Sequence, residues 1–206
     1  MKSRLWFLLA AIGAIGCGGY SADEEVTLGS AVYTQPAPNV KFTEFKTYYL
    51  DPKMEVWEDG AQDVVGQPVP SSTVTTIQQQ MTKYGYTQQA TPPTGTNLPN
   101  ADVGLRLVFL QSNFTYYVSS GYCSVYWAYY ACWPGWAYAG SYSTGTVLMM
   151  MVDTRTGQVA PAPDNATVWA TALYAVLRGS SLENSNQLNS AIVRAYDQSP
   201  YLKNSP

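Results

Sequence analysis

The chain has 206 residues, of which 46% are hydrophobic, and its 11 Lys and Arg face 14 Asp and Glu for a formal net charge of −3. It contains no histidine, which excludes Ser-His-Asp and Cys-His catalytic arrangements and removes the commonest metal ligand. The acidic balance also disfavours a nucleic-acid partner.

The first residues have the layout of a signal peptide. Lys2 and Arg4 precede an uninterrupted apolar stretch of eleven residues, 5–15, and this order is typical of export signals. A helix that spans a bilayer needs about 20 apolar residues, so the stretch is too short for a permanent transmembrane segment. Removing these two cations with the signal moves the net charge from −3 to −5.

Residues 14–17 read Ala-Ile-Gly-Cys. They resemble the bacterial lipobox, in which the cysteine is acylated and becomes the mature N-terminus. We expect residues 1–16 to be removed and Cys17 to carry a lipid anchor that includes palmitate. Two or more acyl chains, at about 0.8 kcal/mol per buried methylene, hold a protein stably at a membrane. The alternative is an ordinary signal peptide followed by an incidental cysteine.

The other two cysteines, Cys123 and Cys132, form an even pair once Cys17 is lipidated. Export places them in an oxidising compartment, where disulfides form and persist. We therefore predict a disulfide between them. The alternative is a pair of free, buried thiols.

Residues 17–41 are expected to form a flexible tether that begins with the lipidated cysteine. The segment is small, polar and mildly acidic, contains Pro36 and Pro38, and shows neither a helical nor a strand period. We expect one folded domain over residues 42–206.

The first predicted strand covers residues 45–50, where β-favouring side chains alternate, and Asp51-Pro52 is expected to end it. Residues 53–70 are predicted to be a surface loop, because turn-forming glycines interrupt an acidic cluster. The cluster consists of Glu55, Glu58, Asp59 and Asp63. It lacks the spacing of an EF-hand calcium loop, so we favour solvated carboxylates over a cation site.

Two helices are predicted, because apolar residues recur at three- and four-residue spacing over residues 71–84 and 182–198. A serine, Ser71 or Ser72, can cap the first helix, and Gly85 is placed to end it. A proline that follows the second helix stops it.

Four further strands are predicted, over residues 101–109, 114–118, 142–152 and 168–177. In the first of these, alternation places Asp102, Gly104 and Arg106 on a solvent-facing side. The last is apolar on both faces, and we choose strand over helix because it follows a hairpin turn. The elements together predict an α+β domain, with an antiparallel sheet of about five strands and two helices packed on one face.

Several short motifs resemble a domain-of-unknown-function family of Gram-negative envelope lipoproteins. They are Phe45-Lys46-Thr47-Tyr48-Tyr49-Leu50, Tyr84-Gly85-Tyr86, Ala101-Asp102-Val103, residues 145–157 and Gln198-Ser199-Pro200-Tyr201-Leu202. The resemblance implies a lipid-anchored periplasmic domain and supplies no catalytic residues. Gly18, which follows the lipidated cysteine, is the residue type that the enteric sorting rule assigns to the outer membrane.

The most aromatic part of the chain is a predicted hairpin at about 114–142, which the family pattern does not require. Its candidate binding residues are Tyr126, Trp127, Tyr130, Trp133 and Trp136. The last two flank a Pro-Gly turn signal and are expected near the tip. Exposed aromatic faces suit sugar rings and protein hot spots. We favour the alternative, in which the rings pair across strands or cover the sheet.

No motif identifies a reaction, and no Gly-rich phosphate-binding loop is present. Carboxylates could in principle form the pair that glycoside hydrolysis requires. However, Asp102 starts a predicted strand, Asp153 starts a turn and Glu183 lies in a first helical turn, so each has a structural explanation. We expect no catalysis, no cofactor and no metal site.

The sequence therefore predicts a non-enzymatic lipoprotein of the cell envelope, anchored in the outer membrane and facing the periplasm. Its expected role is structural or accessory, through contacts with another envelope protein. One alternative is a glycan- or small-ligand-binding module built on the aromatic hairpin. A carboxylate-based hydrolase is the third hypothesis.

Overall fold

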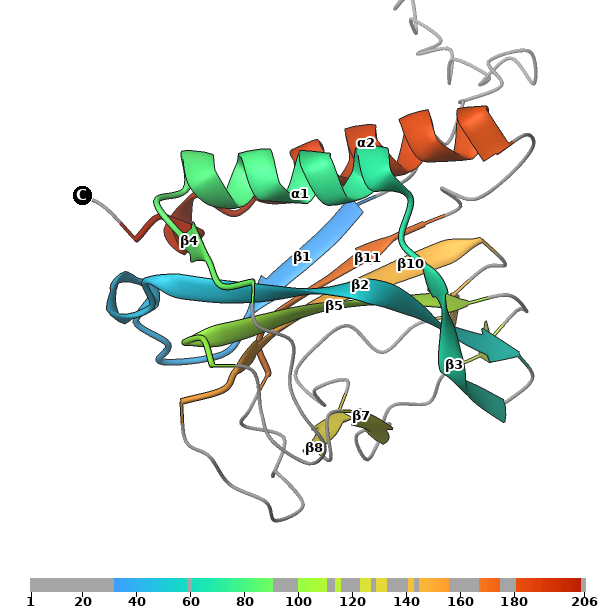
Figure 1. Ribbon diagram of the computed structural model, residues 1–206, viewed down its shortest axis with the longest axis horizontal. Coiled ribbons are helices and arrows are strands. Elements are labelled where there is room, and N and C mark those ends of the chain that lie inside the picture. The colour runs from blue at the N-terminus through green and yellow to red at the C-terminus, as the bar shows by residue number, and fades with distance from the viewer. Residues whose placement is uncertain are drawn as a thin grey trace, which may run out of the picture.

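The computed structural model describes residues 32–58, 61–90, 100–110, 114–115, 123–126, 129–132, 141–142, 145–155, 167–174 and 181–204. One seven-stranded sheet carries two helices on one face (Figure 1). The elements are β1 (Val32–Pro36), η1 (Phe42–Glu44), β2 (Thr47–Glu58), β3 (Ala61–Pro68), α1 (Ser71–Lys83), β4 (Thr87–Gln88), β5 (Val103–Leu110), β6 (Phe114–Thr115), β7 (Cys123–Tyr126), β8 (Tyr129–Cys132), β9 (Ser141–Tyr142), β10 (Thr146–Asp153), β11 (Thr167–Leu173), α2 (Ser181–Asp197) and η2 (Pro200–Leu202).

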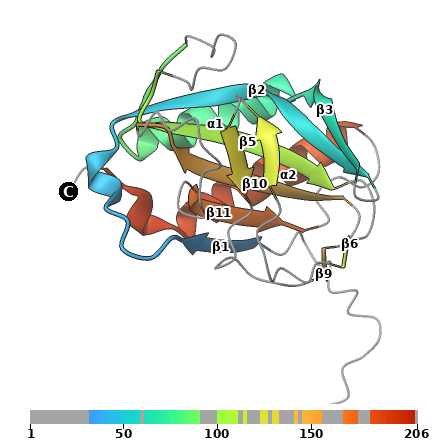
Figure 2. The same ribbon diagram turned by 90° about the horizontal axis from the view of Figure 1, so that it is seen from below.

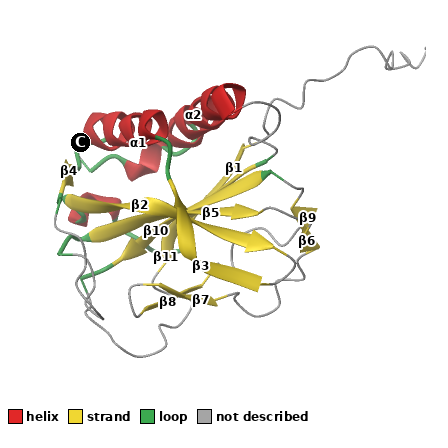
Figure 3. Cartoon of the chain, turned by 45° about the vertical axis from the view of Figure 1, so that its right-hand side comes forward, coloured by secondary structure: helices red, strands yellow, loops and turns green. Residues whose placement is uncertain are grey.

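The predicted α+β class is confirmed, with both helices on one side of an open sheet (Figures 1 and 3). The strand order is β1-β11-β10-β5-β2-β3 (Figure 2), and β4 pairs with the beginning of β2. The expectation of an antiparallel sheet is wrong at two places, because the short strand β4 runs parallel to β2, and β2 and β5 are parallel to each other. The chain passes through β3, α1 and β4 between these strands, and a connection of this length lets the second strand run in the same direction as the first.

The sheet begins earlier in the chain than the sequence suggested. Residues 32–36, assigned above to the tether, form the edge strand β1 and pair with β11 from Val32 opposite Leu173 to Pro36 opposite Trp169. All five residues of β1 are half-buried. A half-buried edge strand does not need alternating apolar and polar residues, so its sequence carried no strand period.

The first helix agrees with its prediction in position and in how it ends. Ile77 and Met81 are fully buried on the side that faces the sheet. Gly85 adopts a φ of 88°, and the Tyr86 N–H donates to the Met81 carbonyl, which is the bond of a Schellman ending. The expected serine cap is wrong, since Pro70 occupies the capping position and no side chain caps the helix.

The second helix, α2, places Leu188, Ile192 and Tyr196 against the core, all fully buried. It lies beside α1 (Figure 1). Neither helix among the described residues has both the length and the hydropathy needed to cross a bilayer.

The predicted loop at residues 53–70 is instead a hairpin of β2 and β3. The pairing of β2 with β5 shifts register between Leu50 and Met54, and this irregularity accommodates Pro52, whose nitrogen cannot donate to a ladder. On β3, Gly66 has a φ of +54°, and a Cβ there would lie 3.2 Å from the Met54 carbonyl oxygen. The hairpin therefore depends on a glycine at this position.

The sheet is buried on both faces, not on one as expected for β5. Val108, Leu148 and Met150 lie on the face away from the helices and are buried. The β7–β8 hairpin lies on this side of the sheet (Figures 1 and 3). Arg106 shares the face, and its side chain is 1% exposed. The prediction that Gly104 and Arg106 of β5 face solvent is therefore wrong.

Arg106 forms an ion pair with Glu55 across the β2–β5 junction. The two side chains are joined at 2.5 Å between Nη2 and Oε1, and Glu55 is 5% exposed. The prediction that Glu55 belongs to a solvated acidic loop is therefore wrong. Of its companions, Glu58 lies in β2 and Asp63 in β3, whereas Asp59 lies outside the described residues.

Candidate functional site

Most of the predicted site residues fall where the structure does not describe side chains. Cys17, Trp127, Trp133 and Trp136 lie outside the described residues. Tyr126 and Tyr130 have described backbones, in β7 and β8. The proposed aromatic binding surface therefore stays a prediction.

The backbone of the aromatic segment is defined by two short antiparallel pairs. Phe114 lies opposite Tyr142 in the β6–β9 pair, and Cys123 lies opposite Cys132 in the β7–β8 pair. The β7 and β8 strands are joined by residues 127–128 alone. The Pro-Gly turn signal between Trp133 and Trp136 lies outside the described residues, so the expected position of these two rings near a tip stays a prediction.

Asp102, one of the three carboxylates considered for catalysis, binds the backbone of the segment that begins β2. Its Oδ2 accepts hydrogen bonds from the N–H groups of Lys46, at 2.7 Å, and Thr47, at 2.9 Å. Burial raises the pKa of this carboxyl, but the bonds from Lys46 and Thr47, with the charge of Arg155, outweigh burial and hold the pKa below its ordinary value. Asp102 is therefore ionised at neutral pH and poorly suited to donate a proton.

Asp153 has a structural partner as well, because its two carboxylate oxygens accept hydrogen bonds from Arg155 Nε at 3.1 Å and Nη2 at 2.8 Å. The side chain of Glu183 is not described. Within the described part of the chain, no three His, Cys, Asp or Glu side chains are placed to hold a metal ion.

Four side chains from distant parts of the sequence form a continuous row at one end of the sheet, which we call the aromatic row. The Tyr201 and Phe42 ring centroids are 5.7 Å apart, and those of Phe42 and Phe45 are 6.1 Å apart. The Arg155 guanidinium lies over the Phe45 ring at 4.4 Å. The two phenylalanines are buried, whereas Tyr201 is 38% exposed and the Arg155 side chain 37%.

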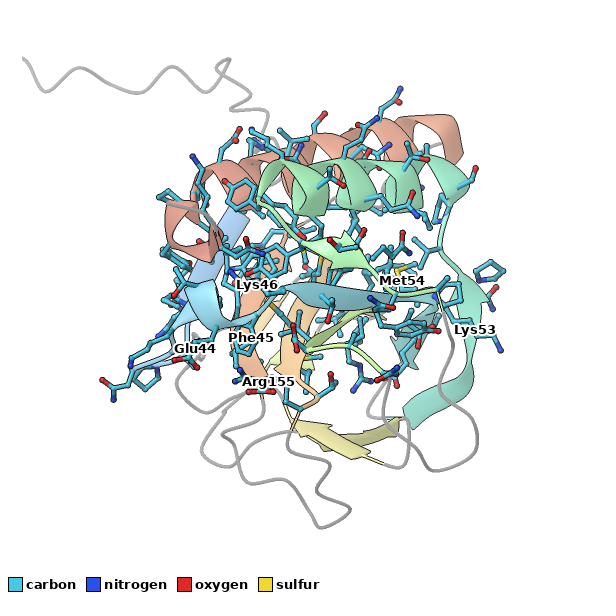
Figure 4. All side chains as sticks on the ribbon, turned by 60° about the vertical axis from the view of Figure 1, so that its left-hand side comes forward. Glu44, Phe45, Lys46, Lys53, Met54 and Arg155 are labelled. Carbon is cyan, nitrogen blue, oxygen red and sulfur yellow. The ribbon has the colours of Figure 1, made fainter. Side chains whose placement is uncertain are left out.

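The bidentate pair with Asp153 fixes Arg155 above Phe45, and Glu44 lies 3.8 Å from its Nη1 (Figure 4). Shallow pockets of about 370 and 430 Å³ lie on either side of it. The first is lined by Asn39, Val40, Lys41, Glu44, Phe45, Asp153 and Val168, and the second by Thr47, Gln89, Asn100, Ala101, Asp102 and Thr154. Both pockets are predominantly polar, which suits contacts at the rim of an interface.

Beside the aromatic row, two lysines lie near the Tyr84 ring, and a third contacts Asn204, whose N–H donates to the Tyr84 carbonyl. We call these three lysines the lysine cluster. The Nζ atoms of Lys83 and Lys203 lie 6.0 and 5.9 Å from the centroid of the Tyr84 ring. Lys46 Nζ donates to the Asn204 carbonyl at 3.2 Å.

The C-terminal segment is fastened to the end of α1 by a set of hydrogen bonds. Tyr86 donates its hydroxyl to the Leu202 carbonyl at 2.8 Å, and Asn204 donates its side-chain amide to the Gly85 carbonyl at 2.7 Å. These bonds join Tyr84-Gly85-Tyr86 to Leu202, the last residue of the C-terminal motif that begins at Gln198, and to Asn204 just beyond that motif. Two motifs that were separate in the sequence therefore form one structural unit, and sequence reasoning missed the surface that they build.

Buried tyrosines below this surface predict a loss of stability at high pH. Burial raises the pKa of Tyr48 from 10.0 to about 12, and burial also raises the pKa of Tyr86 and Tyr196. The neutral hydroxyl of Tyr48 contributes to the free energy of unfolding. This contribution is fully present below pH 10 and is lost as the pH rises from 10 toward 12. A shift of this size corresponds to about 3 kcal/mol.

Urea unfolding at pH 8 and pH 11 measures this effect. The loss of stability between the two pH values should be smaller in Tyr48→Phe than in the wild type. Equal losses in the two proteins would show that Tyr48 does not contribute to the pH dependence of stability.

Comparison with known proteins places these features in a family. The model of the domain of unknown function DUF4136 matches residues 32–201, from the first residue of β1 to the tyrosine of the aromatic row. The chain belongs to the DUF4136 family. The match supports including β1 in the folded domain.

This DUF4136 chain is similar to two solved structures, to different degrees. A DUF4136 family protein from Bacteroides thetaiotaomicron has 22% sequence identity and a TM-score of 0.61, over 86% of this chain and 99% of that one, which shows a shared fold. The PelC dodecamer from Paraburkholderia phytofirmans has 11% identity and a TM-score of 0.35, over 85% of this chain and 99% of that one. A search of curated proteins found no match.

Proposed function

We propose that this DUF4136 protein is a lipid-anchored component of the Gram-negative cell envelope that acts without catalysis, through contacts with another envelope protein. The export signal and the lipobox-like residues that end at Cys17 support the anchor. Gly18, which follows Cys17, supports a position at the outer membrane, facing the periplasm. A structural or accessory role follows from the proposed contacts.

The observation that carries the proposal is the aromatic row. Tyr and Arg are enriched among residues that dominate binding energy at protein interfaces. Here Tyr201 and Arg155 are partly exposed, while buried phenylalanines and Asp153 hold them in place. Such fixed side chains lose little conformational freedom on binding. The row and the lysine cluster together are called the distal surface below.

The distal surface lies at the far end of the sheet from the point where the tether enters. Val32 pairs with Leu173, which pairs with Val147 near the beginning of β10. Arg155 follows the other end of β10, where Asp153 pairs with Val103. The eight residues of β10 span about 25 Å. An anchor before Val32 would leave the distal surface free to meet a partner.

The rival hypothesis is a glycan- or small-ligand-binding module. It depends on the rings of Trp127, Trp133 and Trp136, which lie outside the described residues. The third hypothesis, a carboxylate hydrolase, is disfavoured by the structural engagement of Asp102 and Asp153.

Quantitative co-purification from detergent-solubilised envelopes tests the proposed contact. We expect Tyr201→Ala or Arg155→Ala to weaken recovery of a specific partner, because loss of a hot spot costs at least about 2 kcal/mol, or about 30-fold in affinity. Tyr201→Phe keeps the ring and should retain most binding. Lys53→Ala, an exposed site away from Arg155 (Figure 4), is the control.

Thermal melts of the same variants separate binding from folding. The proposal requires that Tyr201→Ala reduce recovery while the domain stays folded at the assay temperature. Unchanged recovery in both alanine variants would contradict a role for the distal surface.

We also predict that Cys123 and Cys132 are joined by a disulfide. Residues directly opposite in an antiparallel pair have Cα atoms about 4.5–5.5 Å apart, which a disulfide can bridge. Mass spectrometry of the mature protein, alkylated without reduction, should show the linked peptides. Alkylation of both cysteines in freshly isolated envelopes would refute the bond.

A further inference from the structure

The lysine cluster gives one end of an acidic protein a local excess of positive charge. Lys46, Lys83 and Lys203 are exposed, and Lys83 forms an ion pair with Asp197 at 3.2 Å. Against these three lysines stand Asp197 and Asp102, whose carboxylate accepts from the Lys46 N–H, so 3 − 2 leaves one positive charge in excess, whereas the whole chain has a net charge of −3. This asymmetry is an electrostatic signal that can orient a partner.

The positions of these lysines are built into the fold. Lys83 ends α1, Lys203 follows η2, and Lys46 precedes β2. The Tyr84 ring lies near two of the three ammonium groups, and the Asn204 carbonyl holds the third. Hydrogen bonds between the Tyr84-Gly85-Tyr86 segment and the C-terminal segment keep the contributing elements together. The charges therefore gather at one place despite their distance in sequence.

The cluster adjoins the exposed aromatic side chain of the distal surface. Tyr201 and Lys203 are two residues apart, and both are exposed. An ammonium group beside an exposed tyrosine offers one site for a carboxylate and another for an apolar side chain. This combination is common at protein interfaces, where aromatic anchors are surrounded by a polar rim.

We infer that the partner contacted by the distal surface is a protein that presents an acidic segment, whose carboxylates meet Lys83 and Lys203 while an apolar side chain packs on Tyr201. The inference rests on the proposed function and specifies the chemistry of its partner. A phospholipid head group of the anchoring membrane is the less favoured occupant. The cluster lies about 25 Å along the sheet from Val32, which exceeds the Debye length of about 8 Å at physiological salt.

Fluorescence anisotropy on the full chain in neutral detergent tests the inference with defined probes. The first probe is a labelled glutamate peptide with one central tryptophan, and the second replaces each glutamate with glutamine. The acidic peptide should bind at least about tenfold more tightly than its glutamine counterpart, and rising salt should weaken it. Equal binding of the two peptides, or no binding of either, would overturn the inference.

Charge reversal locates the interaction. Lys83→Glu combined with Lys203→Glu should weaken binding of the acidic peptide at least about tenfold, while Lys53→Glu should leave its affinity unchanged. The double reversal changes the net charge by twice as much as Lys53→Glu, so an effect of Lys53→Glu on binding free energy of half the double variant's or more would point to net charge and overturn the site. Displacement of the peptide by glycerol phosphate at similar concentration would indicate a phosphate site and overturn a protein partner.

Partner recovery from envelopes separates this inference from the proposed function. If Tyr201→Ala reduces recovery but the double lysine reversal does not, the distal surface binds a partner that is not acidic. If neither change has an effect, the proposed function fails as well.

Discussion

Replacing Arg106 with Ala is expected to destabilise the domain by about 3–5 kcal/mol. The change leaves the Glu55 carboxylate, 5% exposed, without the guanidinium that neutralises it, and a buried charge that loses its partner is costly. Urea unfolding at neutral pH measures the loss. The same experiment on Glu55→Ala should give a loss of similar size for the same reason.

A double replacement is the matched control for this ion pair. Arg106→Met with Glu55→Leu removes both charges and keeps much of the buried volume, and exchanges of this kind are often neutral or stabilising. We therefore expect the double variant to be more stable than either single variant. A double variant as unstable as Arg106→Ala would show that shape, not charge, governs this part of the sheet.

Replacing Cys17 with Ser is expected to abolish lipid attachment and release the exported chain from the membrane fraction. Serine has no thiol to acylate, and the anchor depends on acyl chains at about 0.8 kcal/mol per buried methylene. Incorporation of labelled fatty acid, followed by membrane fractionation, measures both effects. The folded domain should keep the thermal stability of the wild type, because its described part begins at Val32.

Cys123→Ser is the matched control for the anchor, since it removes a cysteine from the folded domain and leaves the lipobox-like residues unchanged. It should retain both the label and the membrane attachment. Continued labelling of Cys17→Ser would contradict the proposed anchor.

The elements that the sequence predicted well are those with a local signal. The spacing of Ile77 and Met81 located α1, and Gly85 located its end. The alternation in residues 101–109 located β5, and the choice of strand at residues 168–177 agrees with β11. In each case a few neighbouring residues carry the information, because the period and the turn residue are properties of the segment itself.

The errors arose where a distant partner decides the structure. Asp51-Pro52 has the composition of a strand end, but β2 continues because its register shift accommodates the proline. Arg106 and Glu55 look solvent-exposed in their own segments, yet they are buried as a pair that comes together only in the folded sheet. Pairing across the sheet outweighs local composition at these positions.

The distal surface could not be predicted for a similar reason. Its motifs were noticed separately, but no periodicity indicates that Phe42 meets Tyr201 or that Arg155 lies over Phe45. The high aromatic content of residues 114–142 placed the candidate binding residues in that segment instead. The contacts that build the surface depend on the strand order and on the C-terminal segment, and neither is visible in local sequence.

The central claim is that the distal surface contacts a protein partner, and site-specific photo-crosslinking in intact cells tests it most directly. A photoreactive residue would replace either Gln198, beside the distal surface, or Ser72, near the opposite end of α1; both positions are exposed. We predict a specific protein adduct at Gln198 that disappears when Tyr201 is also replaced by Ala, and little adduct at Ser72. An equal adduct at Ser72, or a Gln198 adduct that persists in Tyr201→Ala, would contradict the claim.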